Sequence, residues 1–219
     1  MYLDSNGLIV QADGDGGDTA GREGDYWFAW GLGPFTYTSE IFKMNLDRLQ
    51  VSPGVFVRNP VHYNDPKDFS RDQTVPLILA MGVMGEHETL KLLLKKQIKN
   101  YFRYQNGDIG LLGDLGYYIR AFNAWWAYPV LLVGDLQLLV NSVIRVIKGT
   151  DQDTSDDINH TLGLLQAQYT LPTPISYLAR KIYKHFRSGG IQNAWDNYFK
   201  PSSGANPFND IYRDLINKM

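Results

Sequence analysis

Helical periodicity is the feature that most constrains the fold of this chain. Apolar residues recur every three or four positions in one segment after another, and segments with the alternating pattern of a strand are almost missing. Short helices joined by short turns pack most economically as antiparallel hairpins. The sequence therefore predicts an all-α fold of helical hairpins, interrupted by a long connection near residues 51–69.

Length and composition favour one folded domain. The chain has 219 residues, of which 44% are hydrophobic and 20% charged, and its net charge is −2. Such a chain can bury a full core and is not a strongly cationic nucleic-acid binder. We expect a single helical domain over residues 1–219, with a Gly- and Asp-rich loop over residues 1–17. The lack of cysteine excludes disulfides, thiolate metal ligands and thiol catalysis.

No targeting or membrane signal is visible in the sequence. The first residues show neither the basic segment nor the apolar segment of a signal peptide. The most apolar stretch, residues 121–147, is broken by Pro129 and contains Asp135 and Arg145. We therefore expect buried helices there rather than a bilayer span. These patterns do not indicate the cellular compartment of the protein.

An acidic, glycine-rich segment at residues 13–27 is the first candidate site. Aspartate and glycine alternate there, and Asp13 and Asp15 could supply oxygen ligands to Ca²⁺. The EF-hand pattern fails, however, because Asp18 stands at the sixth position and Gly24 at the twelfth. We therefore expect no metal as the default. Asp18 is either the N-cap of a helix or a carboxylate that acts on a substrate.

A second polar segment, residues 58–73, gathers His, Asp, Asn, Arg and Tyr between two apolar stretches. Ser70 and Gln73 have the spacing of a capping box, which predicts a helix start. Asp72 would lie in the first turn of that helix, where the helix dipole stabilises a negative charge. Such a carboxylate suits a base or a nucleophile. The alternative is an ion-paired helix start without a catalytic role.

Two carboxylates at two helix starts are what the hydrolysis of a glycosidic bond requires. The predicted catalytic pair is Asp18 and Asp72. The residues predicted to bind substrate are Arg22, Tyr26, Trp27, His62 and Arg71. Trp125 and Trp126 are further aromatic candidates for stacking on a sugar, although most aromatic residues belong to cores.

A basic helix is predicted over residues 87–104. Lys91, Lys95, Lys99 and Arg103 recur at helical spacing on one face, and this face could hold a polyanion. The simpler interpretation is a solvated face without a function, and we expect that for the three lysines. Nucleic acid is therefore not an expected partner. The sequence contains neither an HExxH nor a GxSxG motif, so neither a zinc hydrolase nor an α/β-hydrolase is indicated.

Parts of the two polar segments resemble the (α/α) toroids of many glycosidases and polysaccharide lyases. The resemblance rests on residues 17–19, 22–27 and 69–73, which each open a predicted hairpin. It implies that acidic and aromatic residues at the inner helix ends line a sugar cleft. A complete toroid of six hairpins needs more helices than this chain offers. We therefore expect an incomplete, toroid-like ring.

Two functions follow as hypotheses. The first is a carbohydrate-active helical domain, a glycoside hydrolase if Asp18 and Asp72 form a carboxylate pair, with a polysaccharide or oligosaccharide as its partner. The alternative is a non-catalytic helical interaction or structural protein with a protein partner. The sequence leaves open whether the chain is an enzyme.

Overall fold

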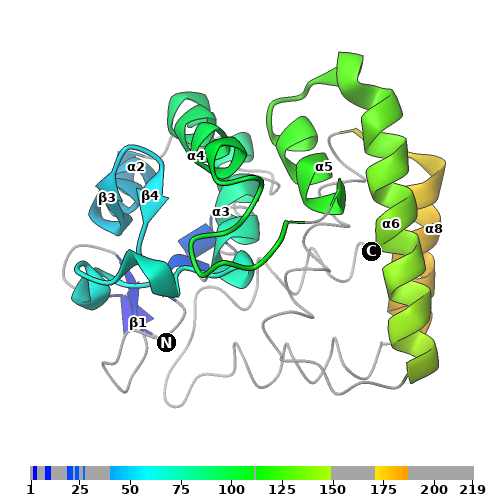
Figure 1. Ribbon diagram of the computed structural model, residues 1–219, viewed down its shortest axis with the longest axis horizontal. Coiled ribbons are helices and arrows are strands. Elements are labelled where there is room, and N and C mark those ends of the chain that lie inside the picture. The colour runs from blue at the N-terminus through cyan, green and yellow to red at the C-terminus, as the bar shows by residue number, and fades with distance from the viewer. Residues whose placement is uncertain are drawn as a thin grey trace. The chain divides into compact units, whose positions relative to one another are not determined.

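The computed structural model is mostly helical over the residues that it describes (Figure 1). These residues are 2–3, 8–10, 19–21, 23–24, 27, 40–110, 112–148 and 171–186. The chain divides into two compact units, Met1–Gly110 and Leu111–Met219. The predicted helical class is confirmed, whereas the toroid-like ring and the single domain stay predictions.

Unit 1 combines helices with short strands and 3-10 turns. Its elements are β1 (Tyr2–Leu3), β2 (Ile9–Val10), α2 (Glu40–Leu49), β3 (Gln50–Ser52), β4 (Val55–Phe56), η1 (Pro60–His62), η2 (Pro66–Asp68), α3 (Arg71–Met84) and α4 (His87–Lys99). The strands pair antiparallel, β1 with β2 and β3 with β4. The long connection near residues 51–69 thus consists of a tight hairpin followed by two 3-10 turns.

Helix α3 is buried on all sides. Every residue from Gln73 to Met81 is buried, as expected for a helix with apolar residues around its whole circumference. The predicted capping box is confirmed at its start, where the Ser70 N–H donates to Gln73 Oε1 at 3.0 Å. Gly85 ends the helix with a left-handed φ of 80°.

Helix α4 ends earlier than the periodicity predicted. It stops at Lys99 rather than near residue 104, because Tyr101 and Phe102 adopt left-handed φ values of 53° and 58°. The helical spacing of Leu90, Leu94, Ile98 and Tyr101 predicts an apolar stripe on this helix, and that prediction is wrong in part, since Ile98 and Tyr101 are 61% and 90% exposed. The face that α4 buries consists of Thr89, Leu90, Leu93 and Gln97.

Unit 2 is helical over its described residues. Its elements are α5 (Leu112–Ala121), the 3-10 turn η3 (Trp125–Ala127), α6 (Tyr128–Lys148) and α8 (Pro174–Phe186). Helix α6 packs against both α5 and α8. Gly134 permits a close approach of α5, because a Cβ atom there would lie 3.0 Å from the Leu112 carbonyl oxygen. Helices are also predicted from the sequence near residues 154–169, 190–199 and 207–218, and these residues lie outside the described part of the chain.

A buried polar network joins helices α5, α6 and α8 of unit 2. Arg120 Nη2 on α5 donates to Asp135 Oδ2 on α6 at 2.7 Å, and both side chains are fully buried. Thr173, directly before α8, donates from Oγ1 to the same carboxylate oxygen at 2.5 Å. The Ser176 N–H donates to Thr173 Oγ1 at 2.9 Å, so Thr173 also caps α8. The network fixes the start of α8 against α6.

The apolar stretch at residues 121–147 forms the end of α5, the η3 turn and most of α6. Ala127 and Leu131 of this stretch form a buried cluster with Ile119, which lies just before it in the sequence. Within the described part of the chain, no helix is both long enough and apolar enough to cross a bilayer.

Candidate functional site

The two polar segments singled out in the sequence contact each other in unit 1. A Cβ atom on Gly24 would lie only 2.4 Å from the carbonyl carbon of Pro76, so the first segment packs backbone to backbone against α3. The Ala20 N–H donates to the Arg58 carbonyl oxygen at 2.9 Å. Asn59 Nδ2 donates to Thr19 Oγ1 at 2.5 Å. Thr19 and Ala20 therefore lie against the start of the second segment, and Gly24 lies against α3, the helix into which that segment leads.

Glu23 is a buried acid at this junction for which the sequence pattern predicted no role. Its side chain is fully buried, and Oε2 accepts the indole N–H of Trp27 at 2.8 Å. Its other oxygen, Oε1, accepts from Asn45 Nδ2 at 3.2 Å. A carboxylate bonded on both oxygens in this way holds the first segment against α2.

Most predicted catalytic and binding residues lie partly or wholly outside the described part of the chain. Asp18, Arg22 and Tyr26 are outside it, as are the candidate calcium ligands Asp13 and Asp15. The backbone places His62 at the end of η1 and Asp72 in the first turn of α3, while their side chains are not described. Arg71 is half-buried at the start of α3. The pairing of Asp18 with Asp72 stays a prediction.

Trp27 lies in the core of unit 1. Its side chain is 5% exposed, and its ring centroid lies 6.0 Å from that of Phe42 on α2. Stacking on a sugar requires an open ring face. The buried position does not favour the predicted contact of Trp27 with substrate, which stays a prediction.

A pocket of about 360 Å³ opens in unit 1 beside the second polar segment. It lies between the β3–β4 hairpin, the η2 turn, the start of α3, and the end of α4 with the loop that follows. Residues at its base are at most 4% exposed: Phe69, Thr74, Leu93, Gln97 and Tyr104. This base offers aromatic and aliphatic surface together with a hydroxyl and an amide.

Two local features build the wall of this pocket. Gly54, at the tip of the hairpin, has a φ of 73°, and a Cβ atom there would lie 2.4 Å from the Leu92 carbonyl oxygen. Only glycine allows the hairpin to lie this close to α4. Gln105 bonds both Phe56 backbone groups, accepting from N–H at 2.9 Å and donating to the carbonyl at 2.7 Å. Its amide also donates to the Pro66 carbonyl at 2.6 Å.

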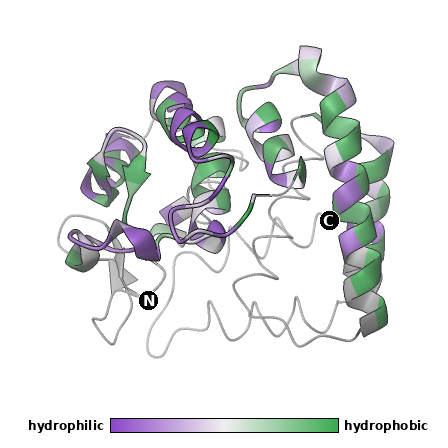
Figure 2. Cartoon of the chain, viewed as in Figure 1, coloured by the Kyte–Doolittle hydropathy of each residue, from purple (hydrophilic) through white to green (hydrophobic). Residues whose placement is uncertain are grey.

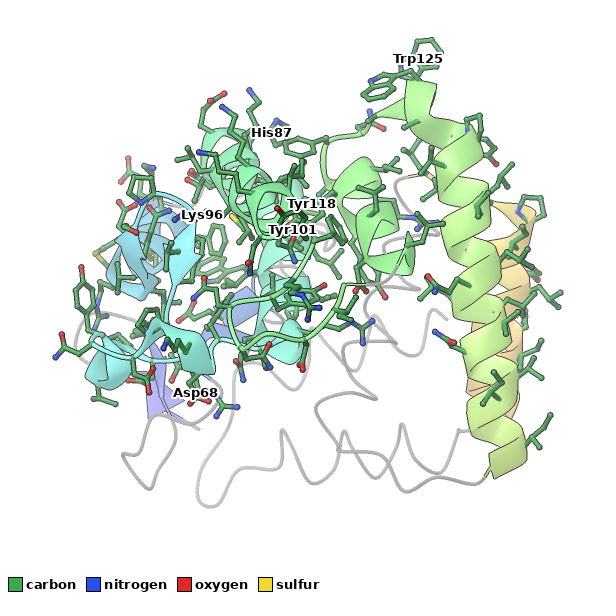
Figure 3. The ribbon with its side chains drawn as sticks, in the orientation of Figure 1. Asp68, His87, Lys96, Tyr101, Tyr118 and Trp125 are labelled. Carbon is green, nitrogen blue, oxygen red and sulfur yellow. The ribbon has the colours of Figure 1, made fainter. Side chains whose placement is uncertain are left out.

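The rim of the pocket is cationic. Its charged residues are Lys67, Lys96, Lys99 and Arg103, and all four are exposed (Figure 3, where Lys96 is labelled). Among the described residues that line the pocket, none is acidic. The three lysines form no ion pair within the described part of the chain. Their charges are therefore available to an anionic group.

The basic residues are visible in the sequence, whereas the pocket is not. Lys91 and Lys95 are exposed away from it, as expected of a solvated face, and Lys91 pairs with Glu88 at 2.5 Å. Lys96, Lys99 and Arg103 differ from Lys91 and Lys95 because they line the pocket together with Gly54. They are three and then four residues apart in the sequence. The approach of the hairpin to α4, which separates these residues from Lys91 and Lys95, depends on tertiary packing and has no signal in the sequence.

The described residues contain no group of three or more His, Asp or Glu side chains that could hold a metal ion. The chain was also compared with known proteins, and no protein-family model, curated protein or solved structure matches it.

Proposed function

We propose that this protein binds an acidic carbohydrate polymer in the pocket of unit 1. The observation that carries the proposal is the cationic rim of the pocket, which consists of Lys67, Lys96, Lys99 and Arg103. The hydroxyls of a sugar bond to amides such as those of Asn100 and Gln105 in the pocket lining. A carboxylate or sulfate on the sugar would pair with the lysines.

The charge of the rim favours an acidic polymer over a neutral one. The described lining of the pocket contains four cationic residues and no acidic residue. A neutral glycan would gain no binding free energy from these charges, whereas an acidic glycan would. The volume of about 360 Å³ lies at the lower end of the usual range for ligand pockets, roughly 300–1,000 Å³. The pocket therefore suits a short stretch of the polymer, with the remainder of the chain outside.

The proposal extends to cleavage of that polymer by the predicted carboxylate pair. Asp72 belongs to the first turn of α3, between the pocket residues Phe69 and Thr74. The first segment, which contains Asp18, contacts α3 at Pro76. In this proposal one carboxyl group protonates the leaving oxygen, and the other acts as base or nucleophile.

Binding to a panel of polymers tests the first part. We expect polygalacturonate, alginate or heparin to bind at about 0.15 M salt and to be released as salt is raised, because the contacts are ionic. Dextran and neutral xylan are the matched neutral controls. Equal affinity for the neutral polymers, or a preference for duplex DNA, would contradict the proposal.

Cleavage is tested separately by product release from whichever acidic polymer binds. Asp18→Asn and Asp72→Asn should each lower turnover by orders of magnitude while the polymer still binds, because asparagine neither transfers a proton nor attacks. Asparagine also caps helices well, so the folded state should be kept. Turnover that survives both substitutions would remove these residues from the chemistry, while binding alone would leave the protein as a lectin-like module.

The exposed apolar side chains of α6 favour a second candidate function, that of a non-catalytic helical interaction protein. Among them are Val133, Leu136 and Val140, which are 53%, 49% and 48% exposed. A solvated helix would normally carry polar residues at such positions.

A further inference from the structure

Helix α4 ends in a turn that ordinarily requires glycine. The Phe102 N–H donates to the Gln97 carbonyl oxygen at 2.7 Å, and the Tyr101 N–H donates to the Ile98 carbonyl oxygen at 3.1 Å. These two bonds define the Schellman motif, in which the first residue after the helix cap is left-handed and usually glycine. Tyr101 occupies that position with a φ of 53°. The turn therefore places a tyrosine where a side chain strains the backbone.

The Tyr101 ring contributes little to the packing of unit 1, although its backbone is strained. Its side chain is 90% exposed. The next residue, Phe102, is also left-handed, but it is half-buried, and a Cβ atom on Gly110 would lie 2.5 Å from Phe102 Cδ1. Figure 2 shows that the loop after α4 is mostly hydrophilic, in keeping with its contact with solvent. Backbone strain that packing does not offset is typical of residues with a functional role.

Tyr101 lies directly beside the pocket of unit 1 (Figure 3, where it is labelled). Pocket-lining residues stand on both sides of it in the sequence, namely Asn100, Arg103, Tyr104 and Gln105. The aromatic residues of the described lining, Phe69 and Tyr104, are at most 1% exposed and offer no open ring face. Tyr101 therefore supplies an aromatic ring that a ligand of this pocket can reach.

The size of the pocket indicates what would meet this ring. A volume of about 360 Å³ holds only a short stretch of a polymer, so the polymer continues past the rim. A sugar ring has an apolar C–H face, which packs on an open aromatic ring. Carboxylates of the same polymer would pair with rim cations such as Lys99 and Arg103, which flank Tyr101 in the sequence.

We propose that Tyr101 is the platform on which one sugar ring of the bound acidic polymer stacks. This inference rests on the proposed function, because it concerns the same pocket. Cations alone attract any polyanion, whereas a stacking platform favours an acidic polymer built from sugar rings. Tyr101 is thus a specificity-determining residue, and the strain at its backbone is retained because glycine at this position would remove the platform.

Two measurements on Tyr101→Gly should move in opposite directions. Glycine relieves the left-handed strain, so the midpoint of urea unfolding should rise. Calorimetric titration of oligogalacturonate should show about 3- to 10-fold weaker binding, because the ring is lost. Tyr101→Trp keeps an aromatic face and should bind like the wild type. Ile98→Ala is the control, since Ile98 is 61% exposed on α4 but outside the pocket lining, and it should not change the affinity.

Polyglutamate separates stacking from charge, because it carries carboxylates but no sugar rings. Wild type and Tyr101→Gly should bind polyglutamate equally. Equal affinity of these two proteins for oligogalacturonate would overturn the platform and leave the proposed function standing. A matching loss of polyglutamate binding, or a lowered urea midpoint for Tyr101→Gly, would also overturn it, because the ring would then support the fold. A wild type that binds no acidic polymer would overturn the proposed function and the platform together.

Discussion

Single residues decide how close the elements of unit 1 can lie. Gly24 and Gly54 both allow backbone-to-backbone contacts, one with Pro76 and the other with Leu92. Neither contact could be predicted from the sequence, because a glycine in a polar segment is equally compatible with an open loop. The contact partner becomes known only from the tertiary structure.

Gly54→Ala should destabilise the protein much more than Gly85→Ala. Both positions have a left-handed φ, of 73° and 80°, which costs alanine about 1–2 kcal/mol. At Gly85 the added methyl group meets nothing within 4 Å, whereas at Gly54 it meets the Leu92 carbonyl oxygen at 2.4 Å. The clash should add about 1–3 kcal/mol. Urea unfolding measures both free energies, and equal losses would contradict the close approach of the hairpin to α4.

Tyr118 should make stability fall at alkaline pH. Burial, with a smaller contribution from Asp114, raises the pKa of Tyr118 well above 10. In the unfolded chain the phenol ionises near pH 10, so the folded state retains a proton that the unfolded state loses. The contribution of the Tyr118 phenol to the free energy of unfolding is therefore complete below about pH 10. Above that pH the contribution falls by at most about 1.4 kcal/mol per pH unit.

The test compares denaturant unfolding of the wild type and Tyr118→Phe between pH 8 and pH 11. The slope of stability against pH above about 10 should be smaller for the variant, which has no phenol to ionise. Tyr101→Phe is the control, because Tyr101 is 90% exposed. Identical slopes for all three proteins would show that the Tyr118 phenol is not buried.

At the scale of elements, periodicity and capping predicted most helices. The capping box at Ser70 and the start of α4 at His87 appear at the expected residues, and the apolar stretch at residues 121–147 is mostly helical, as expected. The errors have physical causes. Tyr101 and Phe102 take left-handed conformations that non-glycine residues rarely adopt, so no local pattern marked the end of α4. Apolar residues at 8–10 and 55–57 indicated one strand of each short ladder, whereas the partner strands are too short to give a periodic signal.

The Arg120–Asp135 pair should show the strong coupling of a buried ion pair. Asp135→Ala leaves a fully buried arginine without its carboxylate and should cost about 3–5 kcal/mol. Replacing both residues with apolar ones, as in Arg120→Met with Asp135→Leu, should cost much less than the sum of the single changes. Chemical unfolding of the four proteins of this cycle measures the coupling. Additive effects would contradict a direct buried contact.

At the scale of the whole molecule, the candidate site was only partly predictable. The sequence located the segments at residues 13–27 and 58–73, and unit 1 brings described parts of them into contact. It gave no indication that Lys96 and Lys99 share a pocket with Phe69, because that pocket forms only when the hairpin packs on α4. Charge on a helix face is visible in a sequence, whereas a cavity beside it is not.

The central claim is that the cationic rim of the pocket, rather than the overall charge of the protein, binds an acidic glycan. Calorimetric titration of oligogalacturonate into two double variants tests it most directly. Lys96→Gln with Lys99→Gln removes two rim charges, whereas Lys91→Gln with Lys95→Gln removes two exposed charges from the same helix outside the pocket. At about 0.2–1 kcal/mol per exposed charge pair, the rim variant should bind roughly 2- to 30-fold more weakly. The control variant should bind like the wild type, and equal weakening of both variants, or no weakening of either, would contradict the claim.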